Sequence, residues 1–136
     1  DGYNQIYGWD SLKFYASKDI AYARDELIQL LLNYQGYKNI KLILVFDAYR
    51  VKDGSCRNSK YGDTQVIYTN YGQTADSYIE KLVHDLKGKY SLTVASSDGL
   101  IQNSILASGA KRMSARELEM RVRNVNKEAF KALKEG

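Results

Sequence analysis

A short run of apolar residues at 40–46 (IKLILVF) places the strongest constraint on how this chain can fold. The run ends at Asp47, and its apolar residues are nearly consecutive instead of alternating with polar ones. A strand of this kind is buried on both faces, which is typical of a parallel sheet covered by helices. A second segment, SLTVAS at 91–96, leads into Asp98. The two segments predict central strands of an α/β layer.

Segments with helical periodicity alternate with these strands. The expected order is helix 19–36, strand 40–46, loop 51–63, strand 65–69, helix 74–87, strand 91–96, helix 100–107 and a final helix from about 114 to 133. Thr74 is the expected N-cap of one helix, and Ser114 with Glu117 forms a capping box for the last. The alternation predicts one α/β domain over 1–136, with a parallel sheet flanked by helices.

Acidic residues stand where such a sheet would place a functional site. The carboxyl ends of parallel strands meet at one edge, and ligands bind there. The acids expected at this edge are Asp1, which opens a DGYN turn, Asp47, Asp76 and Asp98, with Glu80 one helical turn after Asp76. Carboxylate oxygens are preferred ligands of Mg²⁺ and Mn²⁺, and a metal-bound water can attack a phosphodiester. Without a cation, clustered carboxylates would repel one another.

Each acid also has a purely structural explanation. Asp76 would stabilise the N-terminus of its helix by about 0.3–1 kcal/mol through the helix dipole. Asp47 and Asp98 are acceptable as ordinary turn residues, and Asp1 alone carries little information. The joint occurrence of four acids at one expected edge is stronger evidence for a metal site than any one of them, but their spacing alone leaves both explanations open.

The chain carries a formal net charge of +4, and its pI is about 9.0, which favours anionic partners such as nucleic acid. The candidates for phosphate contact are Arg50, Lys52, Arg57 and Lys60 in the loop, and Lys111, Arg112 and Arg116 at the start of the last helix. Asn4 and Ser97 are candidates to position a ligand or a water. Tyr49, Tyr61 and Tyr71 are candidates for base stacking. The alternative for all of them is an ordinary solvated or half-buried surface.

Several other classes are disfavoured by composition. One cysteine, Cys56, and one histidine, His84, cannot supply a disulfide or a four-ligand structural zinc site. No apolar run reaches the length of about 18 residues that suggests a membrane span, and a reducing, cytoplasmic setting is expected. The P-loop pattern GxxxxGK[ST] is absent. A haloacid-dehalogenase-type phosphatase would need aspartate where Tyr3 stands, and the acidic pair of a response-regulator receiver is missing.

The ordered motifs resemble the YacP-like branch of the NYN domains, within the PIN-like nuclease superfamily. The matching stretches are DGYN (1–4), ARDELI (23–28), VFDAYRVK (45–52), VIYT and TADSYIEKL (66–82), VASSDG (94–99) and GAKRMSAREL (109–118). The resemblance implies a PIN-like, Rossmann-like fold and Mg²⁺- or Mn²⁺-dependent cleavage of RNA. It carries over Asp1, Asp76 and Asp98 as site acids, Asp47 as an auxiliary acid and Glu80 as a further candidate ligand.

The resemblance also implies a setting in translation, because relatives in this branch are linked to the ribosome and to mRNA cleavage. RNA and the ribosome are the expected partners, with no membrane and no small organic cofactor. The alternative is a non-catalytic RNA- or ribosome-binding module of the same fold, which the retained acids disfavour. The strand that should precede Asp1 is missing from the sequence, so we expect the chain to be part of a longer polypeptide.

Overall fold

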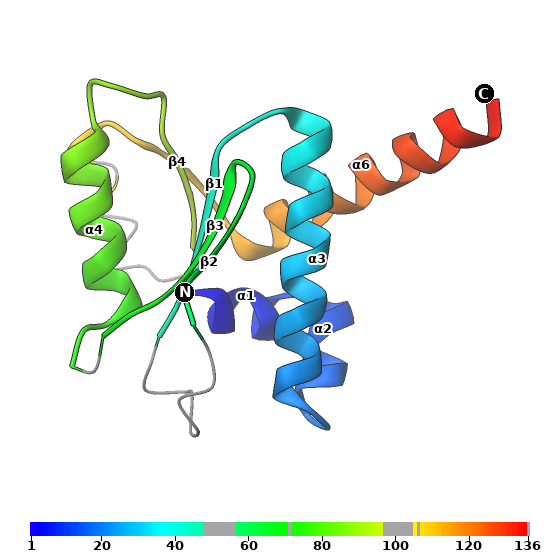
Figure 1. The fold of residues 1–136 in the computed structure, drawn as a ribbon, viewed down its shortest axis with the longest axis horizontal. Helices are drawn as coiled ribbons and strands as arrows, with labels where there is room; N and C mark the ends of the chain where they lie inside the picture. Colours follow the sequence, from blue (N-terminus) through cyan, green and yellow to red (C-terminus); the bar gives the residue numbers. More distant parts are fainter. Residues whose placement is uncertain (48–56, 71, 97–104, 106, 136) are drawn as a thin grey trace.

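The computed structural model describes residues 1–47, 57–70, 72–96, 105 and 107–135. Its helices and strands are α1 (Gly2–Gly8), α2 (Asp10–Ala16), α3 (Ile20–Lys38), β1 (Leu42–Phe46), β2 (Ser59–Tyr61), β3 (Thr64–Tyr68), α4 (Ala75–Leu86), β4 (Thr93–Ala95), β5 (Lys111–Met113) and α6 (Ala115–Glu135). The strands form a central layer, with α4 on one side and α1, α2, α3 and α6 on the other (Figure 1).

The strands belong to two small sheets. β1 pairs in parallel with β3, from Leu42↔Thr64 to Phe46↔Tyr68, and β2 pairs with β3 in the antiparallel sense. β4 pairs in parallel with β5. The α/β class is therefore confirmed. The expected parallel pairing is present in β1–β3 and β4–β5, whereas the antiparallel strand β2 makes the first sheet mixed. The reason is a two-residue turn at Gly62, whose φ of 59° suits a tight hairpin and folds β2 back along β3.

Side-chain caps precede α3, α4 and α6, and those at Thr74 and Ser114 were expected from the sequence. The Asp19 carboxylate accepts hydrogen bonds from the backbone N–H groups of Ala21 and Tyr22, at 3.0 and 3.3 Å. Thr74 Oγ1 caps α4 by accepting from the Ser77 N–H at 3.1 Å. Ser114 Oγ accepts from the N–H of Glu117 at 3.1 Å before α6. One boundary differs, because α3 ends at Asn39 in the left-handed conformation instead of at Gly36.

Four elements were not expected from the sequence. α1 and α2 replace the turn expected at DGYN, β2 lies within the segment 51–63 that was expected to be a loop, and β5 lies just before the final helix. Short elements of this kind depend on burial more than on local propensity. Of the expected helix 100–107, residues 105 and 107 are helical and the rest lies outside the described residues.

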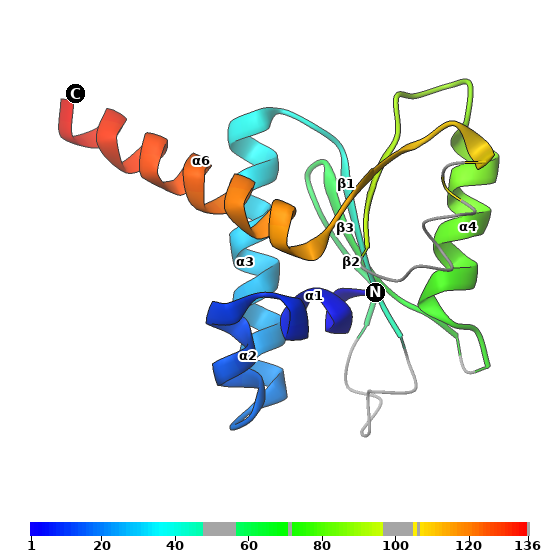
Figure 2. The ribbon, with the colours of Figure 1, turned by 180° about the vertical axis from the view of Figure 1, so that it is seen from behind.

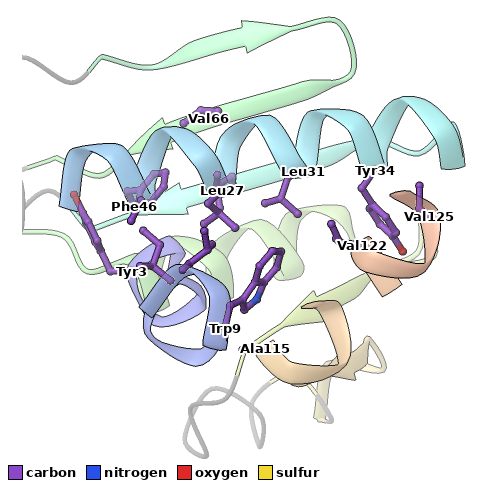
Figure 3. Close-up of a cluster of buried hydrophobic side chains, with 14 residues drawn as sticks. Tyr3, Trp9, Leu27, Leu31, Tyr34, Phe46, Val66, Ala115, Val122 and Val125 are labelled. Atoms are coloured by element: carbon purple, nitrogen blue, oxygen red, sulfur yellow. The ribbon is translucent and has the colours of Figure 1, made fainter. Parts of the chain in front are cut away.

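The main core lies between α3 and the sheet of β1 and β3 (Figure 3). Tyr3, Trp9, Leu27 and Phe46 are at most 1% exposed. The ring centroids of Tyr3 and Phe46 are 5.0 Å apart in an edge-to-face arrangement, and Phe46 stacks on Tyr68 at 5.2 Å. The rings therefore join α1 to the ends of β1 and β3.

The last helix crosses α3 and then extends away from the sheet (Figure 2). Val122 and Val125 are buried in the core at this crossing. The hydroxyl of Tyr37 donates a hydrogen bond to the Glu128 carboxylate at 3.2 Å, and this bond, together with the carboxylate charge, raises the pKa of Tyr37. Across the described ranges, none of the helices is long and apolar enough to cross a bilayer.

The contact between Gly2 and Phe46 gives a prediction about stability. A Cβ at Gly2 would lie 2.4 Å from a ring carbon of Phe46, so Gly2→Ala should destabilise the fold by about 1–3 kcal/mol through overpacking. Gly36→Ala is the matched control, because a Cβ there meets no atom within 4 Å and alanine favours the helix by about 0.5–1 kcal/mol. Urea unfolding midpoints should therefore move in opposite directions. Equal midpoints for the two variants would contradict the close approach.

Candidate active site

The carboxyl ends of β1, β3 and β4 meet next to α1 (Figure 1). The Thr69 N–H donates to the Phe46 carbonyl at 3.0 Å, which continues the β1–β3 pairing one residue past the strands. The side-chain amide of Gln5 donates to the Ala95 carbonyl at the end of β4, at 3.0 Å. Through Gln5, and through Gly2, which packs on Phe46, α1 is attached to the carboxyl ends of strands from both sheets.

Asp1 lies at this edge because the residue after it packs against the end of β1. Gly2 is in contact with the ring of Phe46, and Asp47 follows Phe46 directly in the chain. The Asp1 carboxylate accepts a hydrogen bond from the Tyr3 N–H at 2.9 Å and caps α1. Asp1 and Asp47 are both half-buried. The chain neighbours of two of the predicted acids, Gly2 and Phe46, are therefore in contact at this edge. Asn4 is half-buried on α1.

Asp76 is held by the start of α4. The segment after β3 leads to Thr74, whose cap fixes the first turn of the helix, and Asp76 lies half-buried in that turn. Glu80 lies on the next turn of the same helix and is exposed. A carboxylate in the first turn interacts favourably with the helix dipole, so the structural explanation for Asp76 holds whether or not it binds a cation.

Several predicted site residues lie outside the described residues: Arg50, Lys52, Ser97 and Asp98. The last described residue before Asp98 is Ser96, which is 2% exposed and whose N–H donates to the Met113 carbonyl at 2.8 Å. Within the described part of the chain, no three Asp, Glu, His or Cys side chains are grouped so that they could hold a metal ion. The metal site with all four acids therefore stays a prediction.

The second cluster of basic residues is divided between two elements. Lys111 and Arg112 lie on β5 instead of on the last helix, and Arg116 lies in the first turn of α6. All three are exposed. Because β5 runs parallel to β4, Lys111 stands at the amino end of the sheet, whereas Arg116 follows its carboxyl end. Arg116 therefore lies nearer than Lys111 to the carboxyl edge of the strands, where the acids are expected.

Two polar residues at this edge were missed by the sequence analysis. Gln5 is 4% exposed, and its Oε1 also accepts a hydrogen bond from the Trp9 indole at 3.2 Å. Arg24 is half-buried on α3, and its Nη1 donates to the Tyr3 hydroxyl at 3.3 Å. The available signals were the position of Gln5 one helical turn before Trp9 and the place of Arg24 in ARDELI. Arg24 brings a positive charge to the α1 side of this edge.

The edge therefore combines oxygen ligands with a nearby cation. Half-buried carboxylates at Asp1 and Asp47 have the oxygen chemistry that Mg²⁺ and Mn²⁺ prefer. Guanidinium groups such as that of Arg24 suit phosphate oxygens. A phosphodiester with a divalent cation is the kind of ligand that both features fit.

Comparison with known proteins agrees with the resemblance in the motifs. The family described as the YacP-like NYN domain matches residues 1–136. The chain is 39% identical over 128 residues to the Uncharacterized protein YacP of Bacillus subtilis (strain 168). The aligned region covers 93% of this chain and 75% of that relative.

The fold is also similar to a solved structure. The crystal structure of Rae1 (YacP) from Bacillus subtilis matches with a TM-score of 0.85 and 37% identity, covering 99% of this chain and 78% of that chain. A mutant of the same protein matches with a TM-score of 0.85 and 35% identity, over 99% and 79% of the two chains. The chain therefore belongs to the YacP-like NYN domain family.

Proposed function

We propose that this protein is a metal-dependent endoribonuclease. The observation that carries the proposal is that Gly2, which follows Asp1, packs on the ring of Phe46, which directly precedes Asp47 at the carboxyl end of β1. NYN domains are typically nucleases, and this chain matches the family over its whole length. The basic net charge of +4 adds support for an anionic substrate.

The proposed metal ligands are Asp1, Asp76 and Asp98, with Asp47 as an auxiliary acid and Glu80 as a further candidate. Their carboxylates suit Mg²⁺ or Mn²⁺, which when bound activates a water and neutralises charge on the phosphodiester. The chain's own part is to orient these acids, of which Asp1, Asp47 and Asp76 are half-buried and Glu80 is exposed. The cap of Thr74 orients the turn that carries Asp76, and the Gln5 bridge orients α1 beside Ala95.

The proposed substrate is RNA, with mRNA in a ribosomal setting as the natural target. Arg116, Arg24 and the loop residues Arg50 and Lys52 are proposed phosphate contacts, and Asn4 and Ser97 are proposed to position the substrate or a water. The second candidate function is a non-catalytic RNA- or ribosome-binding module. The basic net charge of +4 and the exposed Arg116 suit this function as well.

The acids give the first prediction about activity. Asp76→Asn combined with Asp98→Asn should lower Mn²⁺-dependent cleavage of a single-stranded RNA by at least about a hundredfold, because amides bind the cation more weakly than carboxylates. EDTA should abolish cleavage by the parent protein, and added Mn²⁺ should restore it. Asp85→Asn is the matched control, because Asp85 is exposed at the other end of α4. Its substitution removes one negative charge, as does each substitution in the double variant. Cleavage by the double variant at the parent rate would exclude the nuclease proposal.

Metal binding can be measured separately from cleavage. Mn²⁺ at about 100 times its Kd should stabilise the parent protein by about 2.7 kcal/mol, which raises its Tm. The Asp76→Asn, Asp98→Asn double variant should show no such rise, while Asp85→Asn should behave as the parent. An equal ionic strength of NaCl controls for screening. RNA binding without any metal-dependent rise would favour the binding module.

The divided basic cluster predicts unequal contributions to RNA affinity. Arg116→Ala should weaken binding of single-stranded RNA and reduce the slope of log K against log salt by about 0.7, as expected for one lost phosphate contact. Lys111→Ala should have a smaller effect, because Lys111 stands at the amino end of β5. Lys127→Ala, an exposed residue further along α6, is the control. Equal slopes for all three variants would argue against a contact at Arg116.

A further inference from the structure

Exposed lysines lie together at the amino end of the strands, opposite the proposed active site: Lys41, Lys87, Lys89 and Lys111. Lys41 directly precedes β1, and Lys111 begins β5. Lys87 and Lys89 lie in the turn between α4 and β4. Figures 1 and 2 show the start of β1 and the end of α4 at the top of the molecule, whereas β1 runs down toward the proposed site. Three segments distant in the chain therefore bring positive charge to one end of the fold.

Tyr90 connects these lysines into one surface. The Nζ of Lys41 lies 5.2 Å from the centroid of the Tyr90 ring, and this residue is 53% exposed. Lys87 forms a β-bridge with Tyr90. The backbone N–H of Lys111 donates to the carbonyl of Leu92, two residues after Tyr90, at 2.9 Å. We call this surface the amino-end patch and define it as Lys41, Lys87, Lys89, Tyr90 and Lys111.

A small pocket of about 120 Å³ opens within the amino-end patch. Lys87, Tyr90, Ser91 and Lys111 are among the residues that line it. Pockets for drug-sized molecules have volumes of about 300–1,000 Å³, so this one is too small for an organic cofactor. Ammonium and hydroxyl groups are hydrogen-bond donors, and lysine is a common partner of phosphate. The pocket therefore matches a single phosphate group in size and in chemistry.

The charge of the amino-end patch stays positive when its acidic neighbours are included. Asp85 is exposed on the last turn of α4. Asp63 is next to β1, because its carbonyl accepts the Leu42 N–H at 2.9 Å. These two acids lower the charge of the four lysines without reversing it. Lys41 covers one face of the Tyr90 ring, which leaves less of that ring for stacking on a base. The patch therefore suits phosphates more than bases.

We propose that the amino-end patch binds the phosphate backbone of double-helical RNA, apart from the single strand that is cleaved at the carboxyl edge. Double-stranded nucleic acid carries one phosphate charge per about 1.7 Å of its axis, twice the density of one strand. Its bases are paired inside, so proteins recognise duplex RNA mainly by its shape, its phosphates and its 2′-hydroxyl groups. A compact group of lysines matches this ligand better than it matches a single strand. The proposal rests on RNA as the ligand of this protein, but not on cleavage.

The test measures binding of a blunt RNA duplex of about 16 base pairs by fluorescence anisotropy, in EDTA to prevent metal-dependent cleavage. Lys87→Gln combined with Lys89→Gln should weaken binding at least about tenfold at about 0.1 M salt, and lower the slope of log K against log salt by about 1.8, as for two lost phosphate contacts. Lys127→Gln combined with Lys131→Gln is the matched control, because it removes the same charge from exposed positions on α6. This control should bind as the parent does, and equal Tm values would show that both variants are folded.

A single strand of the same length separates the amino-end patch from the proposed active site. Its affinity should fall by less than about threefold in the Lys87→Gln, Lys89→Gln variant, because the single strand binds at the carboxyl edge instead. The Asp76→Asn, Asp98→Asn variant should bind the duplex as the parent does. Loss of cleavage and loss of duplex binding are then separate results, so failure of the nuclease proposal can be told from failure of this one.

Equal duplex affinities in the Lys87→Gln, Lys89→Gln variant and its control would overturn the proposal, and so would a parent protein that does not bind the duplex. An equal loss for the single strand and the duplex would overturn the assignment to double-helical RNA. Binding to anionic lipid vesicles that depends on Lys87 and Lys89, without binding to the duplex, would identify a membrane surface as the partner instead.

Discussion

The close approach of Gly2 to the ring of Phe46 determines where the first helix can lie. Because glycine has no side chain, the backbone of α1 reaches the end of β1 at a distance that any Cβ would prevent. Tyr3 packs edge-to-face on the same ring, and Asp1 and Asp47 are the chain neighbours of Gly2 and Phe46. The packing of the core and the position of an acidic residue at the proposed site thus depend on one contact.

Gln5 extends this arrangement to the second sheet. Its amide binds the Ala95 carbonyl and the Trp9 indole, so both polar ends of a buried side chain are satisfied. Loss of either partner would leave a buried polar group without a hydrogen bond, at a cost of about 1–3 kcal/mol. The two bonds therefore favour this placement of α1 next to β4 over other placements. It keeps the end of β4, and the segment that leads to Asp98, next to α1. The Gln5–Ala95 hydrogen bond and the Gly2–Phe46 contact connect α1 to the carboxyl ends of strands in both sheets.

The charge distribution explains why a cation belongs in the proposed mechanism. The chain is basic overall, with 20 lysine and arginine residues against 16 acids, whereas the proposed site at the carboxyl edge of the strands is made of acids. Bare carboxylates there would repel a phosphodiester. A divalent cation reverses the local sign and joins the two negative partners. Arg24 and Arg116 then suit the phosphates on either side of the edge.

The sequence by itself determined the α/β class, the main helices and strands with their caps, and the family, because local periodicity, capping residues and ordered motifs are properties of short segments. It also predicted which acids to consider, from their positions after apolar strands. Only the tertiary structure decided that residues 2–8 and 10–16 are helical, that β2 reverses along β3 and that Lys111 and Arg116 stand at opposite ends of β5. Those features depend on burial of Tyr3, Trp9 and Phe46 against residues distant in the chain. Such long-range packing outweighs the weak local preferences of short segments.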